Sequence, residues 1–169
     1  QVTQADGTVL PVNYIARFKN GQWSAVASGV NSSVYSLAVV ERPAGGHDLY
    51  VGGGFTTATD GSGTKTVNRL AKWDGNNWQP VGAGVNNSVL SIVHSKARGG
   101  LYIGGWFTNA YSFDGGSTLS LKRSGFWDLT TQQWRVMGDG MTGYSLTFQE
   151  TADGQNVYVS GIGLKRFDW

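Results

Sequence analysis

Short apolar runs that end at glycine dominate the hydrophobic pattern of this chain. Residues 33–40 (SVYSLAVV) and 88–95 (SVLSIVHS) alternate in part between apolar and polar positions and are rich in β-branched and aromatic residues. Residues 47–53 (HDLYVGG) and 99–105 (GGLYIGG) are shorter apolar runs stopped by glycine. Such runs predict β-strands, and no apolar stripe with helical spacing extends over about 11 residues or more. The pattern therefore predicts an all-β chain.

Many of these segments occur more than once, at a nearly constant interval. LYVGGGF at 49–55 returns as LYIGGWF at 101–107 and, in a weaker form, as VYVSGIG at 157–163. Three further sets keep a spacing of 54 to 56 residues: Asp-Gly at positions 6, 60 and 114, tryptophan at positions 23, 78 and 134, and GVN at positions 29 and 84. A fixed period of this length is typical of proteins built from stacked structural repeats.

Each repeat predicts about four short strands. WDGNNW at 73–78 places an Asp-Gly pair between two aromatic residues, a strong hairpin signal because glycine accepts the positive φ of a tight turn. The repeat divides the chain into the end of one unit (1–28), two whole units (29–83 and 84–139) and an incomplete unit (140–169). In chain order, these segments predict two, four, four and three strands.

Glycine pairs and aromatic residues in these units resemble the blades of kelch-type β-propellers, the fold of the galactose oxidase central domain. The matching positions in the two whole units are Gly52, Gly53, Trp73 and Trp78, and then Gly104, Gly105, Trp127 and Trp134. The finer signature is GGxFT, followed by N-x-[LI]-A-x-[WF]-x-G-x-x-W and by G-V-N-x-S-V. It is similar to secreted propellers that include bacterial cell-surface repeat proteins and the fungal cortical polarity-marker family. The resemblance covers essentially the whole chain and implies an all-β, partial β-propeller of about three four-stranded blades of 54–56 residues.

The recurring glycines and aromatic residues have an architectural role in this interpretation. Strands near a propeller axis are crowded, so the glycine pairs let backbones approach where a Cβ would collide. Phe55 and Phe107 are expected to fill the space between units. Trp23, Trp78 and Trp134 are expected to bury a large apolar area at the interfaces between units.

The strand count predicts an incomplete ring. Known propellers have roughly 4 to 8 blades, and the third strand of a blade is predicted near both ends of this chain, at 13–18 and 164–168. Open strand edges favour further pairing. We therefore expect the partners to be other blades of the same longer chain or other copies, and the longer chain is the preferred interpretation.

Composition excludes several classes of function. Charged residues make up 14% of the chain and the formal net charge is +2 without a basic run, which argues against nucleic-acid binding. No apolar run approaches the roughly 20 residues of a membrane span. Cysteine is absent, which removes disulfides, thiolate metal sites and cysteine nucleophiles.

No catalytic motif is present, so the sequence predicts a chain that is not an enzyme and needs no cofactor. The two histidines, His47 and His94, lie at unrelated repeat positions without metal-ligand spacing, and no G-x-S-x-G motif occurs. The loops at Asp60 and Asp114 carry one carboxylate each, whereas calcium loops usually converge several. A solvated turn is favoured over a metal site there, and these two loops are where a metal ion would be sought.

Asn31 and Asn86 begin N-x-[ST] sequons at matching repeat positions. In a secreted eukaryotic chain, exposure on a loop between units would make both candidate N-glycosylation sites. Duplication of one ancestral unit also explains the pair without any modification, so both interpretations stay open.

Departures from the repeat are the best guide to a ligand. Trp106 stands where Gly54 stands in the preceding unit, and its surroundings add Asn109, Tyr111, Phe113 and Asp114. Aromatic faces beside amide and carboxylate groups suit sugar binding, because a pyranose offers apolar C–H faces ringed by hydroxyls. The alternative, which we favour, is that Trp106 packs across its own unit and the other rings cover an adjacent one.

The leading hypothesis is a non-catalytic propeller module, extracellular or at the cell surface, that serves structural or adhesive contacts with a protein or glycan partner. A carbohydrate-binding, lectin-like propeller is the first alternative. The second is the non-catalytic part of a larger propeller enzyme. A complete galactose-oxidase-type site is excluded, because that family's chemistry needs a cysteine-linked tyrosine and this chain has no cysteine.

Overall fold

The computed structural model describes residues 1–111, 118–141 and 143–161, and this part of the chain contains strands and no helix. None of it therefore forms a helix that is long and apolar enough to cross a membrane. In chain order the strands are β1 (Val2–Thr3), β2 (Val9–Leu10), β3 (Ala16–Lys19), β4 (Gln22–Ala25), β5 (Val34–Glu41), β6 (His47–Gly53), β7 (Thr57–Asp60), β8 (Gly63–Thr66), β9 (Leu70–Trp73), β10 (Trp78–Pro80), β11 (Val89–Ser95), β12 (Gly100–Gly105), β13 (Asn109–Tyr111), β14 (Thr118–Ser120), β15 (Ser124–Asp128), β16 (Gln133–Val136), β17 (Ser145–Glu150) and β18 (Val157–Gly161).

The strands form antiparallel sheets that repeat one arrangement. The first four-stranded sheet has the order β10-β9-β6-β5, and the second has the equivalent order β16-β15-β12-β11. Two strand pairs flank them, and we call β3–β4 the N-terminal pair and β17–β18 the C-terminal pair. By chain position, the N-terminal pair corresponds to the two outer strands of a four-stranded sheet, and the C-terminal pair to the two inner strands.

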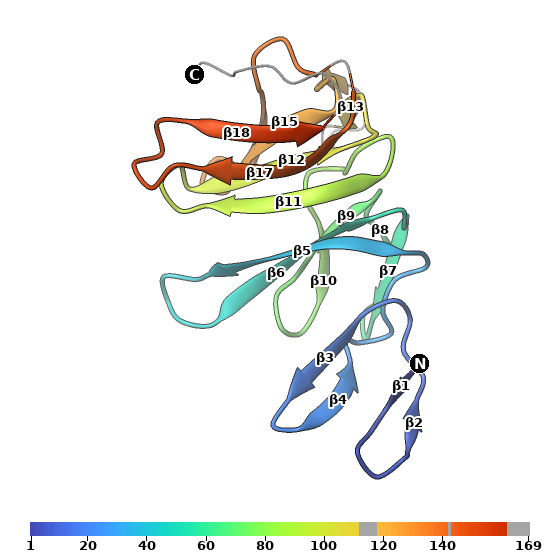
Figure 1. Cartoon of the computed structure of the whole chain (residues 1–169). Helices are drawn as coiled ribbons and strands as arrows, with labels where there is room; N and C mark the ends of the chain where they lie inside the picture. The colour runs from blue at the N-terminus through green and yellow to red at the C-terminus, as the bar shows by residue number, and fades with distance from the viewer. Residues whose placement is uncertain (112–117, 142, 162–169) are drawn as a thin grey trace.

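The sheets stack face to face, with β5, β11 and β17 in successive layers (Figure 1). Three apolar clusters lie between the layers. The first joins the N-terminal pair to the first four-stranded sheet through residues such as Ile15 and Trp78. The second joins the two four-stranded sheets, and the third joins the second sheet to the C-terminal pair. Burial between sheets, rather than within one sheet, is therefore the main source of apolar stabilisation.

The predicted Asp-Gly hairpin forms between β9 and β10, where Trp73 pairs with Trp78 across the strands. The rings of this pair lie 5.2 Å apart. The same cross-strand aromatic pair recurs as Phe18–Trp23 at 4.9 Å and Trp127–Trp134 at 5.3 Å. Tilted or T-shaped aromatic pairs at this distance stabilise a strand pair beyond the area they bury.

Close backbone contacts explain the recurring glycine pairs. A Cβ added to Gly53 would lie 2.1 Å from the Ser33 carbonyl oxygen, and one added to Gly105 would lie 2.2 Å from the Ser88 carbonyl oxygen. Each of these two glycines therefore faces the chain that enters the inner strand of its own sheet. Gly52 instead faces the neighbouring sheet, because a Cβ there would meet Val89 at 2.5 Å.

The prediction of four strands per unit was incomplete, because each of the first three units also contains a separate two-stranded hairpin. These hairpins are β1–β2, β7–β8 and β13–β14, and they belong to no four-stranded sheet. Their strands are short, with two residues each in β1 and β2 and mostly polar sequences such as TATD and GTKT in the others. Without an apolar run they give no strand signal in the sequence, and Asp60 lies at the end of one of them.

The expectation that all three repeat tryptophans are buried was wrong for Trp23. Trp78 is fully buried and Trp134 partly buried, but Trp23 is 36% exposed. Trp78 and Trp134 pack against the layer that precedes theirs, whereas among the described residues only the small β1–β2 hairpin precedes the N-terminal pair, and no stacked layer does. The third strand predicted at 164–168 lies outside the described residues.

Candidate functional site

The two sequon asparagines make the same set of hydrogen bonds in their two units. The side-chain oxygen of Asn31 (Oδ1) accepts the N–H groups of Thr56 and Thr57 at 2.8 and 3.0 Å. Its side-chain nitrogen (Nδ2) donates to the Thr56 hydroxyl at 3.0 Å. Asn86 repeats this pattern with Thr108 at 2.9 and 3.0 Å and with the N–H of Asn109 at 3.0 Å. We call each arrangement the Asn–Thr clip.

The clip explains why two sequence motifs recur together. It ties the loop before an inner strand (GVN) to the loop after the next strand (GGxFT), so the asparagine and the threonine are partners in space. Because both side chains are engaged in holding loops, their recurrence follows from the fold without glycosylation. Asn31 is exposed and Asn86 half-buried.

Asp60 lies at the end of β7, and its side chain is completely buried. One carboxylate oxygen accepts the Ser62 N–H at 2.8 Å and the Ser62 hydroxyl at 2.6 Å. The other accepts the Trp78 N–H at 2.6 Å and the Lys65 ammonium at 3.1 Å, and Lys65 also donates to the Trp78 carbonyl at 2.7 Å. Asp60 and Lys65 together therefore hold both backbone groups of Trp78. We call this arrangement the carboxylate clamp.

Residues 61–64 of the Asp60 loop are exposed, but the Asp60 carboxylate itself is buried and enclosed by donors. The hydrogen bond from the Ser62 hydroxyl, followed by that from the Trp78 N–H, holds the pKa of Asp60 well below its ordinary value. Its oxygens are occupied by protein donors that include an ammonium group, which leaves no place for a cation. Among the described residues, no three His, Asp or Glu side chains gather as metal ligands would. Asp114 lies outside the described residues.

Gln4 does the work of this clamp in the N-terminal part of the chain. Its amide donates to the Trp23 carbonyl at 2.7 Å, and its carbonyl oxygen accepts the Trp23 N–H at 2.9 Å. One neutral amide therefore supplies the donor and acceptor that Asp60 and Lys65 supply for Trp78. Asp6, which has the matching position in the sequence, bonds instead to Thr8 and accepts its N–H within the hairpin turn.

Glu150 on β17 joins the C-terminal pair to the second four-stranded sheet. Its carboxylate accepts the Ser95 hydroxyl at 2.7 Å and the Tyr102 hydroxyl at 2.8 Å, and it lies 3.5 Å from the Arg98 Nε. Burial, with the hydrogen bond to Glu150 as the next cause, raises the pKa of the Tyr102 hydroxyl. The tyrosine therefore stays protonated, and the cluster holds two layers together.

The residues around Trp106 that suggested a ligand site are only partly described, and the described ones do not form one cluster. Trp106 is 48% exposed, and its ring meets the edge of Tyr144 at 6.1 Å. Asn109 and Tyr111 lie two residues apart on β13, both half-buried, and their backbones bond to the loop that contains Asn86. Phe113 and Asp114 lie outside the described residues.

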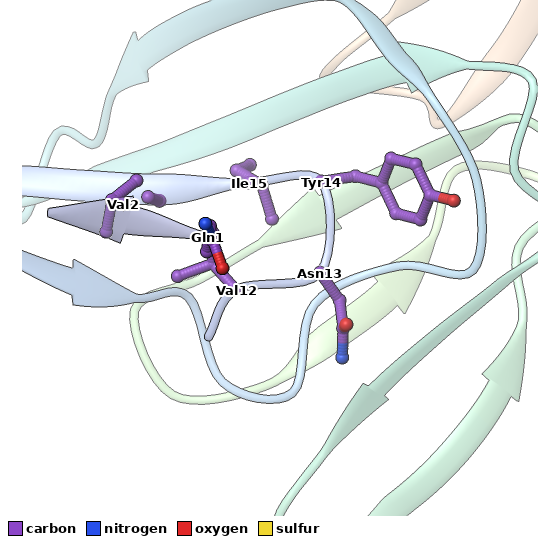
Figure 2. A pocket seen from close by; sticks show the side chains of 7 residues that line it. Gln1, Val2, Val12, Asn13, Tyr14 and Ile15 are labelled. Atoms are coloured by element: carbon purple, nitrogen blue, oxygen red, sulfur yellow. The ribbon is translucent and has the colours of Figure 1, made fainter. Parts of the chain in front are cut away.

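A hollow of about 520 Å³ lies beside the start of β3 and is lined by Gln1, Val2, Val12 and residues 13–16. Val2, Val12 and Ile15 lie together on one side of it, whereas Tyr14 projects away from them (Figure 2). A second hollow of about 460 Å³ continues from Tyr14 to Tyr35 and Leu37 on β5. In the first four-stranded sheet, the corresponding position beside β9 is filled by β6.

Sequence reasoning missed the clip, the clamp and the Glu150 cluster. The clip had a signal, since Asn31 with Thr56 and Asn86 with Thr108 recur at matching positions. The clamp had only half a signal, because Asp60 recurs as Asp6 and Asp114 but its partner Lys65 does not recur, and the Glu150 cluster had none. Tyr144, the partner of Trp106, was also missed.

Comparison with known proteins gives one informative similarity. No family model matches the chain, and no solved structure matches it. The chain is similar to Polarized growth protein L1 of Phoma sp. (strain ATCC 20986 / MF5453), with 28% identity over 164 residues. The similarity covers 89% of this chain and 12% of the length of that protein. It agrees with the resemblance to fungal polarity proteins.

Proposed function

We propose that this chain is a non-catalytic, kelch-like β-propeller segment that acts in cell polarity as an interaction module at the cell surface. The similarity to a polarized growth protein runs along 89% of the chain and supports the cellular role. Stacked antiparallel sheets with β5, β11 and β17 in successive layers support the propeller interpretation (Figure 1).

The observation that carries the proposal is that the polar residues of the repeat bind the chain itself. Asn31 holds a loop, Asp60 holds an outer strand, and Glu150 holds two layers together. These hydrogen bonds support a scaffolding role for the three residues. A rigid scaffold that presents variable surface residues suits a role in protein contacts.

A localisation experiment in the source cell tests this function. The full-length protein with a fluorescent tag should concentrate at sites of growth, and a membrane-impermeant reagent should label it on intact cells. Deletion of residues 1–169 should disturb the axis of growth. Uniform distribution together with undisturbed growth would contradict the role in polarity, and protection from the reagent would contradict the location at the surface.

Glycan binding is the second candidate function, and the pair of Trp106 with Tyr144 favours it. The exposed Trp106 ring, with the half-buried Tyr144 ring beside it, offers an apolar surface of the kind that stacks on a sugar. Trp106→Ala should then abolish binding on a glycan array while Val136→Ala, at another exposed apolar position, leaves it intact. Equal binding by the wild type and a correctly folded Trp106→Ala variant would remove this function.

A further inference from the structure

Two faces at opposite ends of the stack expose residues that the repeat buries elsewhere. Tyr158, on the C-terminal pair, is 65% exposed. Leu37 and Val39, on β5 of the first four-stranded sheet, are 52% and 55% exposed. Exposed apolar residues that gather on one face commonly mark an interaction surface.

Strand pairing identifies the equivalent positions in the interior of the stack. Leu37 lies opposite Val51, just as Ile92 lies opposite Ile103 and Phe148 opposite Val159. The tyrosines also correspond, because Tyr50, Tyr102 and Tyr158 each occupy the same place on the second strand of their sheets, opposite Ala38, Val93 and Gln149.

Inside the stack, these two positions pack on each other. Tyr50 and Ile92 belong to one cluster between the four-stranded sheets and are 5% and 4% exposed. Tyr102 stacks on Phe148 at 5.6 Å in the next interface, where the two residues are 0% and 3% exposed. In both interior interfaces, the tyrosine of one layer therefore lies in the same apolar cluster as the Leu37-type residue of the following layer.

We propose that the Tyr158 face of one copy of this chain packs on the Leu37 face of a second copy, continuing the interface already formed between its own layers. The proposal is independent of the role in cell polarity. Tyr158 would cover Leu37 and Val39 of the second copy, in the way that Tyr102 stacks on Phe148 inside the chain. Inside the chain, the Ser36 hydroxyl accepts the Ile92 N–H of the following layer at 2.9 Å. The Thr147 hydroxyl would take the place of Ser36 in the new interface.

The open side of the N-terminal pair has the shape that this contact requires. Among the described strands, β3 pairs only with β4, and the hollow of about 460 Å³ between β3 and Leu37 lies where an inner strand pair belongs. The C-terminal pair is an inner strand pair. One chain thus carries an outer strand pair at one end and an inner strand pair at the other, which together would make one four-stranded sheet. Because the contact joins two different faces, it leads to rings or filaments rather than a symmetric dimer.

Sedimentation of the full 169-residue chain with two single-face variants tests this arrangement. The wild type should associate as its concentration rises towards about 100 µM, a range suited to a weak specific contact. Leu37→Asp and Tyr158→Asp should each be monomeric, since a buried unpaired carboxylate opposes the contact. Both positions are exposed in the monomer, so melting temperatures should stay near that of the wild type.

Mixing the two variants provides the decisive measurement. Leu37→Asp keeps an intact Tyr158 face and Tyr158→Asp keeps an intact Leu37 face, so an equimolar mixture should form a dimer and nothing larger. Val136→Asp, at an exposed position away from both faces, should associate like the wild type. A monomeric wild type, or a mixture that stays monomeric, would overturn the proposal.

A shortened chain that ends at Gly161 sharpens the result. The sequence predicts a third strand at 164–168, which would compete with β3 of the second copy for the edge of β18. Removing residues 162–169 should therefore leave association as strong or make it stronger. Weaker association would show that the end segment makes the contact, and the proposal would be wrong.

Discussion

Trp78 and Trp23 occupy the same position in two units, yet one is fully buried and the other is 36% exposed. Each pairs with an aromatic residue across its hairpin, and each has its backbone N–H and carbonyl held by the side chains of a separate hairpin. The difference lies in what stacks on the outer face. Trp78 meets the N-terminal pair, and nothing in the described chain meets Trp23 in that way.

The comparison separates two levels of structure. Strand pairing, turns and clamps are set within a unit, so they recur wherever its sequence recurs. Burial is set by the neighbouring layer, so identical residues contribute differently to the free energy of unfolding. The predictions below use matched positions in the two regions to test this separation.

Replacing the buried tryptophan should have the largest effect. Trp78→Ala should lower the free energy of unfolding by about 3–5 kcal/mol, the usual loss when a large buried side chain leaves a cavity. Trp23→Ala should cost only about 1–2 kcal/mol, since much of its surface is already in water. Urea denaturation of both variants measures the difference, and equal losses would show that burial does not separate the two units.

Replacing the second glycine of a glycine pair with alanine should have the next largest effect. Gly53→Ala places a methyl group against the Ser33 carbonyl and should cost about 3 kcal/mol, at the upper end of overpacking effects. Gly105→Ala should cost the same, because the contact is local to each sheet. Gly61→Ala is the control, since nothing lies within 4 Å of the added atom, and it should stay within about 0.5 kcal/mol of the wild type. Unequal losses at Gly53 and Gly105 would contradict the local origin of the contact.

The two clamps should respond differently to pH. The pKa of Asp60 is lower in the folded chain than its ordinary value of about 3.9, so its charge stabilises the fold above that pH. This stabilisation is lost as the pH falls below about 3.9 towards the folded-state pKa. Asp60→Asn should therefore be destabilised at neutral pH and approach the wild type in acid.

Gln4→Ala is the matched control, because its clamp on Trp23 carries no charge. Its difference from the wild type should stay constant across the same pH range. Thermal unfolding at a series of pH values gives both curves. A constant difference for Asp60→Asn would show that the clamp does not depend on the carboxylate charge.

Breaking an Asn–Thr clip should give the smallest effect. Asn86→Ala should cost about 1 kcal/mol, the net value of one or two hydrogen bonds on a partly exposed loop. Ser88→Ala removes the same sequon but keeps the clip, so its stability should match that of the wild type. If the two variants lose the same stability when the protein is made in a glycosylating host, the sequon rather than the clip is responsible.

The sequence predicted the sheets well because their strands carry apolar runs and their turns carry glycine. The first four-stranded sheet runs from Val34 to Pro80, inside the predicted unit 29–83. The small hairpins escaped prediction because polar strands such as TATD have no buried face to mark them. Burial of Trp23 was predicted wrongly because the burial of a repeat residue depends on its neighbour.

The candidate sites were harder to predict, because their side chains interact with residues that are distant in the sequence. Asp60 looked like the tip of a solvated turn, and only the fold reveals that Trp78, 18 positions later, donates to it. Trp106 was identified from its departure from the repeat, but its partner Tyr144 belongs to the next unit. Local sequence carries no information on such contacts.

The Asn–Thr clip has a consequence for how such a chain can evolve. Both of its members belong to one repeat, 25 positions apart in one case and 22 in the other. Duplication or deletion of one period of coding DNA therefore adds or removes a complete Asn–Thr clip, never one half of it. Chains of this type can change their number of units between species while every remaining loop keeps its anchor.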